Sequence, residues 1–266
     1  MDNVFDFKQG TLPLLISVPH AGLELTAAVQ AGLVPQALGL PDTDWHIPRL
    51  YDFAEQIGAS VLSARYSRYV IDLNRPGDDK PLYAGATTGL FPSILFEGDP
   101  LFKEGQAPSD AERAVYLQKI WGPYHRALAQ ELERLRGEFG YALLWDAHSI
   151  RAQVPHLFEG QLPDFNLGTF NGASCDPSLA AELESVCASN PDFTYVFDGR
   201  FKGGHITRHY GDPARDIHAV QLELVQRAYM EEFAPFRYRE EIAAPTRVQI
   251  QALLQTMLDW GARRYA

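Results

Sequence analysis

The stretch ALLWDAHSIRAQ, residues 142–153, indicates the fold class of the chain. Its apolar first half predicts a buried strand over Tyr141–Trp145. An acid, an imidazole and a hydroxyl follow as Asp146, His148 and Ser149. Ligands of open α/β sheets bind at the carboxyl ends of the strands. We therefore interpret His148 as a candidate metal ligand that Asp146 or Ser149 orients.

Apolar runs and helical patterns alternate along the rest of the chain. Further strands are predicted over Leu12–Val18, Ala59–Ala64, Tyr69–Leu73, Phe165–Thr169, Phe193–Phe197 and Ala219–Leu224. Helices are predicted over His46–Ile57, Ser109–Phe139 with a bend at Pro123, Pro177–Ala188 and Thr246–Arg264. Pro76–Pro108 is rich in Gly and Pro and predicts a long binding loop or lid. This alternation predicts a three-layer α/β domain around a mostly parallel or mixed sheet.

Length and composition limit the possible partners and the cellular location. The 266 residues are 46% hydrophobic, which suits one domain over residues 1–266. A net charge of −11 argues against nucleic acid and against an anionic membrane surface as partners. Cys175 and Cys187 form no disulfide framework, and neither a signal peptide nor a membrane-length apolar run is present. We expect a cytoplasmic protein.

The predicted strand exits carry the residues that a hydrolytic zinc site requires. Such a site takes three protein ligands from His and carboxylate groups and needs a carboxylate to relay a proton. His20, His148 and one of Asp42 or Asp44 could be the ligands, and Glu223 could be the base. Each residue also has an ordinary structural interpretation, such as a helix N-cap for either aspartate.

Six longer segments carry a resemblance to a known family. They are SVPHAG (17–22), GLPDTDWHIPRLYDFA (39–54), SRYVIDLNRPGDD (67–79), PLYAGATTGLFP (81–92), LLWDAHSIR (143–151) and GGHITRHYG (203–211). The chain resembles N-formylglutamate amidohydrolases, or deformylases, of bacterial histidine degradation over nearly its whole length. The resemblance implies a zinc-exopeptidase-like fold with a central mixed sheet, shared with metallocarboxypeptidases and aspartoacylase-like deacylases. It also implies cleavage of N-formyl-L-glutamate to L-glutamate and formate.

The same resemblance assigns roles to several residues. Asn74 and Arg75 resemble the pair that holds a substrate carboxylate, His148 resembles the second histidine ligand, and Glu223 resembles the catalytic glutamate. Zinc is the expected metal, and Arg75 is expected to stabilise the oxyanion as well.

The middle metal ligand departs from the wider pattern, in which a glutamate lies three residues after the first histidine. That position is Leu23 here, so the ligand stays open. Asp44 is preferred, followed by Asp42 and Glu24, and His46 is a further competitor.

Arginines suit a substrate with two carboxylates, because a planar guanidinium binds a carboxylate through two hydrogen bonds. After Arg75, the expected partners are Arg208 and Arg68, with His205 as a further polar contact. Residues between Pro81 and Phe102 are expected to limit the size of the acyl group. We expect no macromolecular partner other than a possible second copy, so the protein would be a monomer or a small homo-oligomer.

Three alternatives stay open at this level. Ser149 or Cys175 could act as a nucleophile, and the helix after Cys175 could lower its pKa. The chain could be a non-enzymatic binding protein for acidic amino acids. It could also cleave another N-acyl acidic amino acid or a formimino compound.

Overall fold

A mixed sheet forms the centre of the computed structural model, which describes residues 3–82 and 88–266. Within these residues, seven strands are arranged in the order β1-β3-β2-β4-β7-β5-β6. Their bounds are β1 Phe5–Lys8, β2 Leu14–Val18, β3 Ser60–Ala64, β4 Ala142–Ile150, β5 Phe165–Gly168, β6 Tyr195–Phe197 and β7 Ile217–Val225. The β1–β3 and β5–β7 pairs are antiparallel and the other pairs are parallel. The predicted mixed α/β sheet is confirmed.

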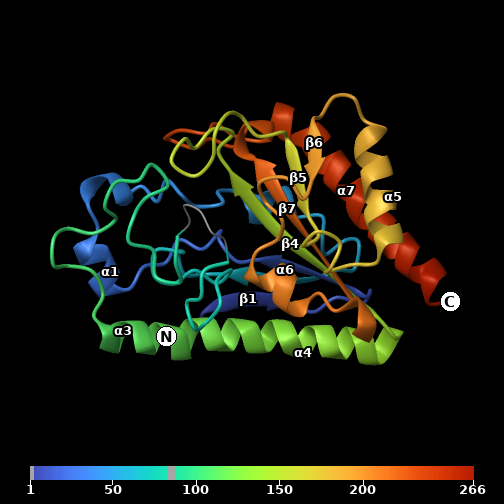
Figure 1. Cartoon of the computed structure of the whole chain (residues 1–266), viewed down its shortest axis with the longest axis horizontal. Helices are drawn as coiled ribbons and strands as arrows, with labels where there is room; N and C mark the ends of the chain where they lie inside the picture. The colour runs from blue at the N-terminus through green and yellow to red at the C-terminus, as the bar shows by residue number, and fades with distance from the viewer. Residues whose placement is uncertain (1–2, 83–87) are drawn as a thin grey trace.

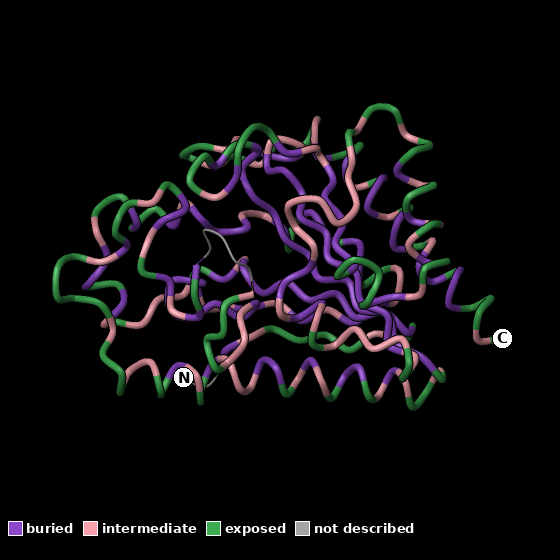
Figure 2. The backbone as a smooth tube through the Cα atoms, in the orientation of Figure 1, coloured by how far each residue is buried: buried purple, intermediate pink, exposed green. Residues whose placement is uncertain are grey.

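Helices cover both faces of this sheet (Figure 1). α4 (Gly122–Phe139) lies along one face, and α5 (Pro177–Ala188) and α7 (Glu240–Arg264) lie along the other. The alternation along β4 explains both contacts: Leu144 packs in the core cluster that contains α4, whereas Leu143 packs in the cluster that contains α5 and α7. All nine residues of both β4 and β7 are buried, as Figure 2 shows by the purple centre of the sheet.

The long predicted helix over Ser109–Phe139 forms in three parts. α3 (Asp110–Tyr116) begins at a capping box between Ser109 and Glu112. A π-helical turn over Leu117–Trp121 leads into α4. Pro123 lies just after this turn, at the start of α4, where its missing N–H is tolerated.

Two strand predictions need correction. The strand predicted over Tyr141–Trp145 continues to Ile150, because β7 runs beside it in register up to Val225. Asp146 and His148 therefore lie inside β4 rather than after it. The prediction of a strand over Tyr69–Leu73 is wrong: this buried segment is a turn, across which Arg68 and Asp72 form an ion pair of 2.7 Å.

The helix predicted over His46–Ile57 is also mostly wrong. Only α2 (Ile47–Leu50) is α-helical. The next residues form turns, closed largely by hydrogen bonds between residues three apart, such as that from Ala54 N to Tyr51 O. These turns keep the apolar side chains of the segment in the core, which explains why the sequence has a helical pattern.

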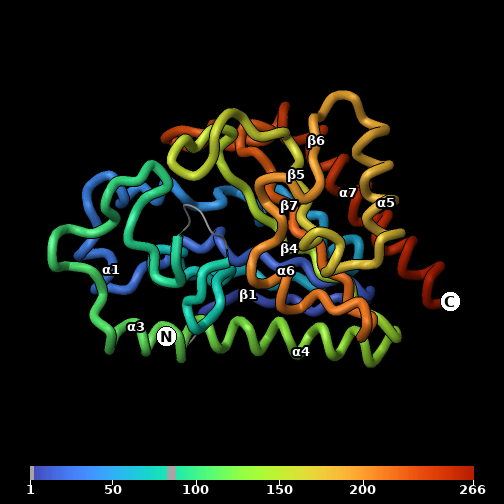
Figure 3. The backbone as a smooth tube through the Cα atoms, viewed as in Figure 1, coloured from blue at the N-terminus to red at the C-terminus, as the bar shows by residue number. Residues whose placement is uncertain are grey.

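The irregular segments gather at one end of the molecule, together with α1 (Ala27–Gly32) (Figure 3). The predicted loop over Pro76–Pro108 has neither a helix nor a named strand in its described part. Residues 83–87, which lie in the region expected to limit acyl size, are outside the described residues. No helix in the described part of the chain combines the length and apolarity needed to cross a bilayer.

Candidate metal centre and substrate pocket

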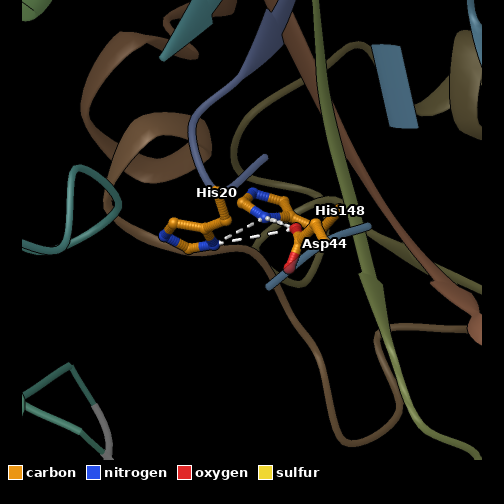
Figure 4. A group of neighbouring side chains, drawn as sticks. All are labelled: His20, Asp44 and His148. Atoms are coloured by element: carbon orange, nitrogen blue, oxygen red, sulfur yellow. Dashed lines mark hydrogen bonds and ion pairs between the residues drawn. The ribbon is translucent and has the colours of Figure 1, made fainter. Parts of the chain in front are cut away.

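Two histidines and an aspartate converge beside the carboxyl ends of β2 and β4 (Figure 4). His20 lies two residues after β2, His148 lies near the end of β4, and Asp44 lies in the turn before α2. The Nδ1 atoms of His20 and His148 are 3.1 Å apart. Asp44 Oδ2 is 3.3 Å from His148 Nδ1 and 3.8 Å from His20 Nδ1.

This donor set fits a divalent metal such as zinc. Zinc bonds His nitrogen and carboxylate oxygen at about 2.0–2.2 Å, so tetrahedral ligand atoms lie about 3.3–3.6 Å from one another. The three distances lie around this range, and all three side chains are buried. His20, Asp44 and His148 could therefore hold a metal ion through Nδ1, Oδ2 and Nδ1.

A carboxylate faces the other nitrogen of each histidine. Asp72 Oδ1 is 2.6 Å from His20 Nε2, and Asp146 Oδ2 is 2.9 Å from His148 Nε2. Such partners fix the tautomer and ring orientation of a metal-binding histidine. Asp146 therefore lies where the sequence interpretation expects it, in a position to orient the His148 ring. The Ser149 hydroxyl bonds Tyr229 instead, although the Ser149 N–H donates to Asp44 Oδ2 at 3.1 Å.

The charges around the ligands favour a cation. Burial lowers the pKa of His20, which favours the neutral ring that a metal requires. Burial acts in the same direction on His148, but Asp146, Asp44 and Glu223 outweigh it and raise its pKa well above the usual value. The carboxylates that raise the pKa of His148 would also attract a divalent cation, which would displace the proton from this ring on binding.

Glu223 lies directly across from His148, on the neighbouring strand β7. Its side chain lines the pocket beside both histidines. Burial, followed by the nearby Asp44, raises its pKa to about 8, against the opposing influence of His148. Gln221, two residues earlier on the same strand face, donates from Nε2 to Glu223 Oε2 at 3.3 Å. Glu223 is thus a buried, oriented carboxylate next to the ligand group.

The side chain of Asn74 contacts other residues of the protein through both its oxygen and its nitrogen, although its expected role is to bind the substrate. It lines the pocket, but its Oδ1 accepts from Ile206 N at 2.8 Å. Its Nδ2 lies 2.8 Å from His148 Nε2 and donates to Asp146 Oδ2 at 3.2 Å. Gly204 must be glycine at this contact, because a Cβ there would lie 2.3 Å from Asn74 Nδ2.

The arginines separate into those that line the pocket and those that do not. Arg68 and Arg75 line it, and Arg75 donates to Thr88 O at 2.8 Å and to Asn74 O at 3.0 Å. Arg208 instead donates to the backbone of Gly203 at 2.7 Å. Neither Arg208 nor His205 is among the described residues that line the pocket.

The sequence interpretation missed three residues of the site. Asp72 was part of a predicted strand, although it holds His20. Gln221 could have been found, because residues two apart on a strand share a face with Glu223. Arg200, which lines the pocket, has no motif or periodic signal in the sequence.

The competing candidates for the middle ligand have other partners. Asp42 Oδ2 accepts from Tyr69 OH at 2.8 Å and from Phe96 N at 3.0 Å. Glu24 pairs with Arg65 at 2.6 Å. His46 Nε2 lies 2.6 Å from Phe236 O. Asp44 alone among these four belongs to the ligand group found in the described residues.

The Cys175 thiol is poorly suited to act as a nucleophile. It is buried, and burial raises its pKa to about 12, which is the opposite of the lowering that the alternative of a nucleophilic Cys175 requires. Its side chain packs in the core cluster on the α5 and α7 side of the sheet.

Comparison with known proteins identifies the family. The family model described as N-formylglutamate amidohydrolase matches residues 12–230. A Pseudomonas putida protein named N-formylglutamate deformylase is 69% identical over 265 residues, covering 100% of this chain and 99% of its own. A protein of the same name from Pseudomonas aeruginosa is 65% identical over 266 residues, with 100% of both chains covered.

Solved structures agree with this result. The crystal structure of N-formylglutamate amidohydrolase from Ralstonia eutropha JMP134 has a TM-score of 0.83 and 25% identity, with 98% of both chains covered. A protein from Agrobacterium tumefaciens shares the fold with a TM-score of 0.74 and 16% identity, covering 97% of this chain and 94% of its own. The resemblance seen in the sequence segments is confirmed. The chain is a hydrolase that belongs to the N-formylglutamate amidohydrolase family.

Proposed function

We propose that this protein is a metal-dependent deformylase that cleaves N-formyl-L-glutamate to L-glutamate and formate. The observation that carries the proposal is the convergence of His20, Asp44 and His148 beside Glu223, in a pocket that arginines line. The full-length similarity to proteins named N-formylglutamate deformylase supports this choice of substrate. The reaction would be the last step of a histidine degradation pathway, in the cytoplasm.

His20, Asp44 and His148 would hold the divalent metal, with zinc as the expected ion. When bound, such a metal polarises a carbonyl and lowers the pKa of water. Asp72 and Asp146 would keep both Nδ1 atoms directed at the ion by accepting from the Nε2 atoms.

Glu223 would accept a proton from the water that attacks the formyl carbon. The same carboxyl group would then return the proton to the substrate nitrogen as the C–N bond breaks and formate leaves. Its position across from His148 places it beside the ligand group, as this relay requires.

Arg68 and Arg75 would bind the substrate at its reacting end. Arg68 is buried beside Asp72, and Arg75 is anchored to the backbone of Asn74, so both guanidinium groups have fixed positions in the wall. A cation held in this way can bind the α-carboxylate or offset negative charge on the formyl oxygen. Asn74 would orient His148 and Asp146 as well as contact the substrate.

Formate release from N-formyl-L-glutamate tests the proposal. The purified protein is assayed as prepared, after chelator treatment, and after zinc is restored, with N-acetyl-L-glutamate as the matched substrate. We expect fast release that the chelator abolishes and zinc restores. Chelator-resistant release would move the chemistry to a protein nucleophile. Faster cleavage of the acetyl compound would reassign the substrate.

A further inference from the structure

We propose that Arg200 recognises the side-chain carboxylate of the substrate and so sets the selectivity for a glutamyl group over neutral analogues. This inference rests on the proposed function. Arg200 lies between β6 and α6 (His205–Tyr210) and is half-buried in the pocket wall.

The guanidinium of Arg200 is fixed across two segments of the chain. It donates from Nε and Nη2 to the Leu157 carbonyl, at 3.3 Å and 3.1 Å. Leu157 belongs to the connection between β4 and β5, so these bonds join two walls of the pocket. A planar cation held in this way is preorganised, because little side-chain freedom is lost when it binds an anion.

The wall around Arg200 is apolar. Ile150, Leu157 and Phe201 line the pocket with it, and its guanidinium lies 5.4 Å from the Phe201 ring centroid. Phe201 in turn packs edge-on against Phe158. A short methylene chain that ends in a carboxylate, as in glutamate, matches an apolar stretch next to a cation.

The other two arginines of the pocket are anchored closer to the metal ligands. Arg68 pairs with Asp72, which holds His20. Arg75 donates to the backbone of Asn74, whose side chain contacts His148. Arg200 is instead anchored to the Leu157 carbonyl, in the connection between β4 and β5. The substrate has one carboxylate near the formamide and one at the end of its side chain, and these two positions match the two groups of arginines.

The test compares R200M with the wild-type enzyme on N-formyl-L-glutamate and on N-formyl-L-glutamine, an isostere that keeps the α-carboxylate but has a neutral side chain. A charge-assisted hydrogen bond corresponds to about a 10- to 100-fold change in binding. We therefore expect R200M to lose about 10- to 100-fold in kcat/KM for the glutamate substrate, mainly through KM. The kcat/KM for the glutamine substrate should change little. The selectivity ratio, which is kcat/KM for the glutamate substrate divided by kcat/KM for the glutamine substrate, should therefore collapse. R200K should recover part of the ratio, because lysine keeps the charge but not the planar contact.

Arg208 provides the competing assignment, so R208M is measured in parallel and should keep the ratio. The proposal is overturned if R200M keeps the wild-type ratio, if it slows both substrates equally, or if R208M collapses the ratio instead. Should R200M unfold, R200K carries the test alone, and an unchanged ratio in that variant also overturns the proposal. Wild-type protein that releases formate from neither compound refutes the proposed function itself, which is a separate outcome.

Discussion

Replacing Asp146 by asparagine should weaken metal binding while the fold stays intact. Asp146 is fully buried, and its Oδ2 lies 2.9 Å from His148 Nε2. An asparagine oxygen can still accept from Nε2, but it carries no charge to offset the metal. Loss of such a partner typically reduces metal affinity about 10- to 100-fold. This range corresponds to about 1.4–2.7 kcal/mol of binding free energy.

The assay is zinc affinity, measured by competition with a chelator of known strength at fixed pH. D42N is the matched control, since Asp42 is a buried carboxylate whose hydrogen bonds go to Tyr69 and Phe96. D146N should bind zinc about 10- to 100-fold more weakly than D42N, while its far-UV circular dichroism matches that of the wild-type protein. At saturating zinc its urea midpoint should be lower than that of D42N, because weaker binding stabilises the native state less. Equal zinc affinity in D146N and the wild-type protein would refute the reasoning.

Asp72 is a less suitable choice for this experiment. It accepts from both His20 and Arg68, and both of its oxygens are used. Removing its charge would leave the Arg68 guanidinium buried without its partner, which costs about 3–5 kcal/mol. Loss of stability would then be mixed with loss of metal affinity.

Three further outcomes are expected. Glu223→Gln should lower kcat by about 10²- to 10⁴-fold while one metal ion per chain is retained, and near wild-type turnover by a metal-loaded variant would rule out a proton relay at this residue. Because burial raises the pKa of Cys175 and Cys187 to about 12, iodoacetamide should leave formate release unchanged in the native enzyme, and inactivation that matches labelling of either thiol would show otherwise. Burial, with a smaller contribution from His205, lowers the pKa of His125 to about 3. Below pH 6.5 the unfolded chain therefore binds a proton at His125 that the folded protein does not bind. The free energy of unfolding should decrease by up to about 1.4 kcal/mol per pH unit as the pH falls from 6.5 toward 3, and this loss is absent above pH 6.5. Urea unfolding at pH 7.5 and 5.5 should therefore show a smaller pH dependence in H125Q than in the wild-type protein, and equal dependence would contradict this assignment.

The sequence predicted where helices begin when the residues next to the helix start determine that position. Pro177–Ala188 forms α5 with the predicted bounds, because Asp176 caps it and Pro177 occupies its first turn. The capping box at Ser109 and Glu112 marked the start of α3 equally well. By contrast, the extension of β4 to Ile150 depends on pairing with β7, which is distant in sequence.

The sequence predicted which types of residue form the candidate site, but not which residues each of them contacts. Asp42 and Asp44 lie two residues apart in one loop, and only the tertiary structure directs Asp44 at the histidines and Asp42 at Tyr69. Arg200 reaches the pocket because its bonds to Leu157 join segments that are 43 residues apart in sequence. No local pattern carries that information. The cytoplasmic location and the oligomeric state stay predictions.

Anomalous diffraction at the zinc edge, from crystals of the zinc-loaded protein, tests the central claim most directly. We expect one strong peak within bonding distance of Nδ1 of His20, Nδ1 of His148 and Oδ2 of Asp44, with Glu223 beside it and outside the bonded set. A peak held by Asp42, Glu24 or His46, or no peak among these residues in protein that is active and zinc-dependent, would contradict it.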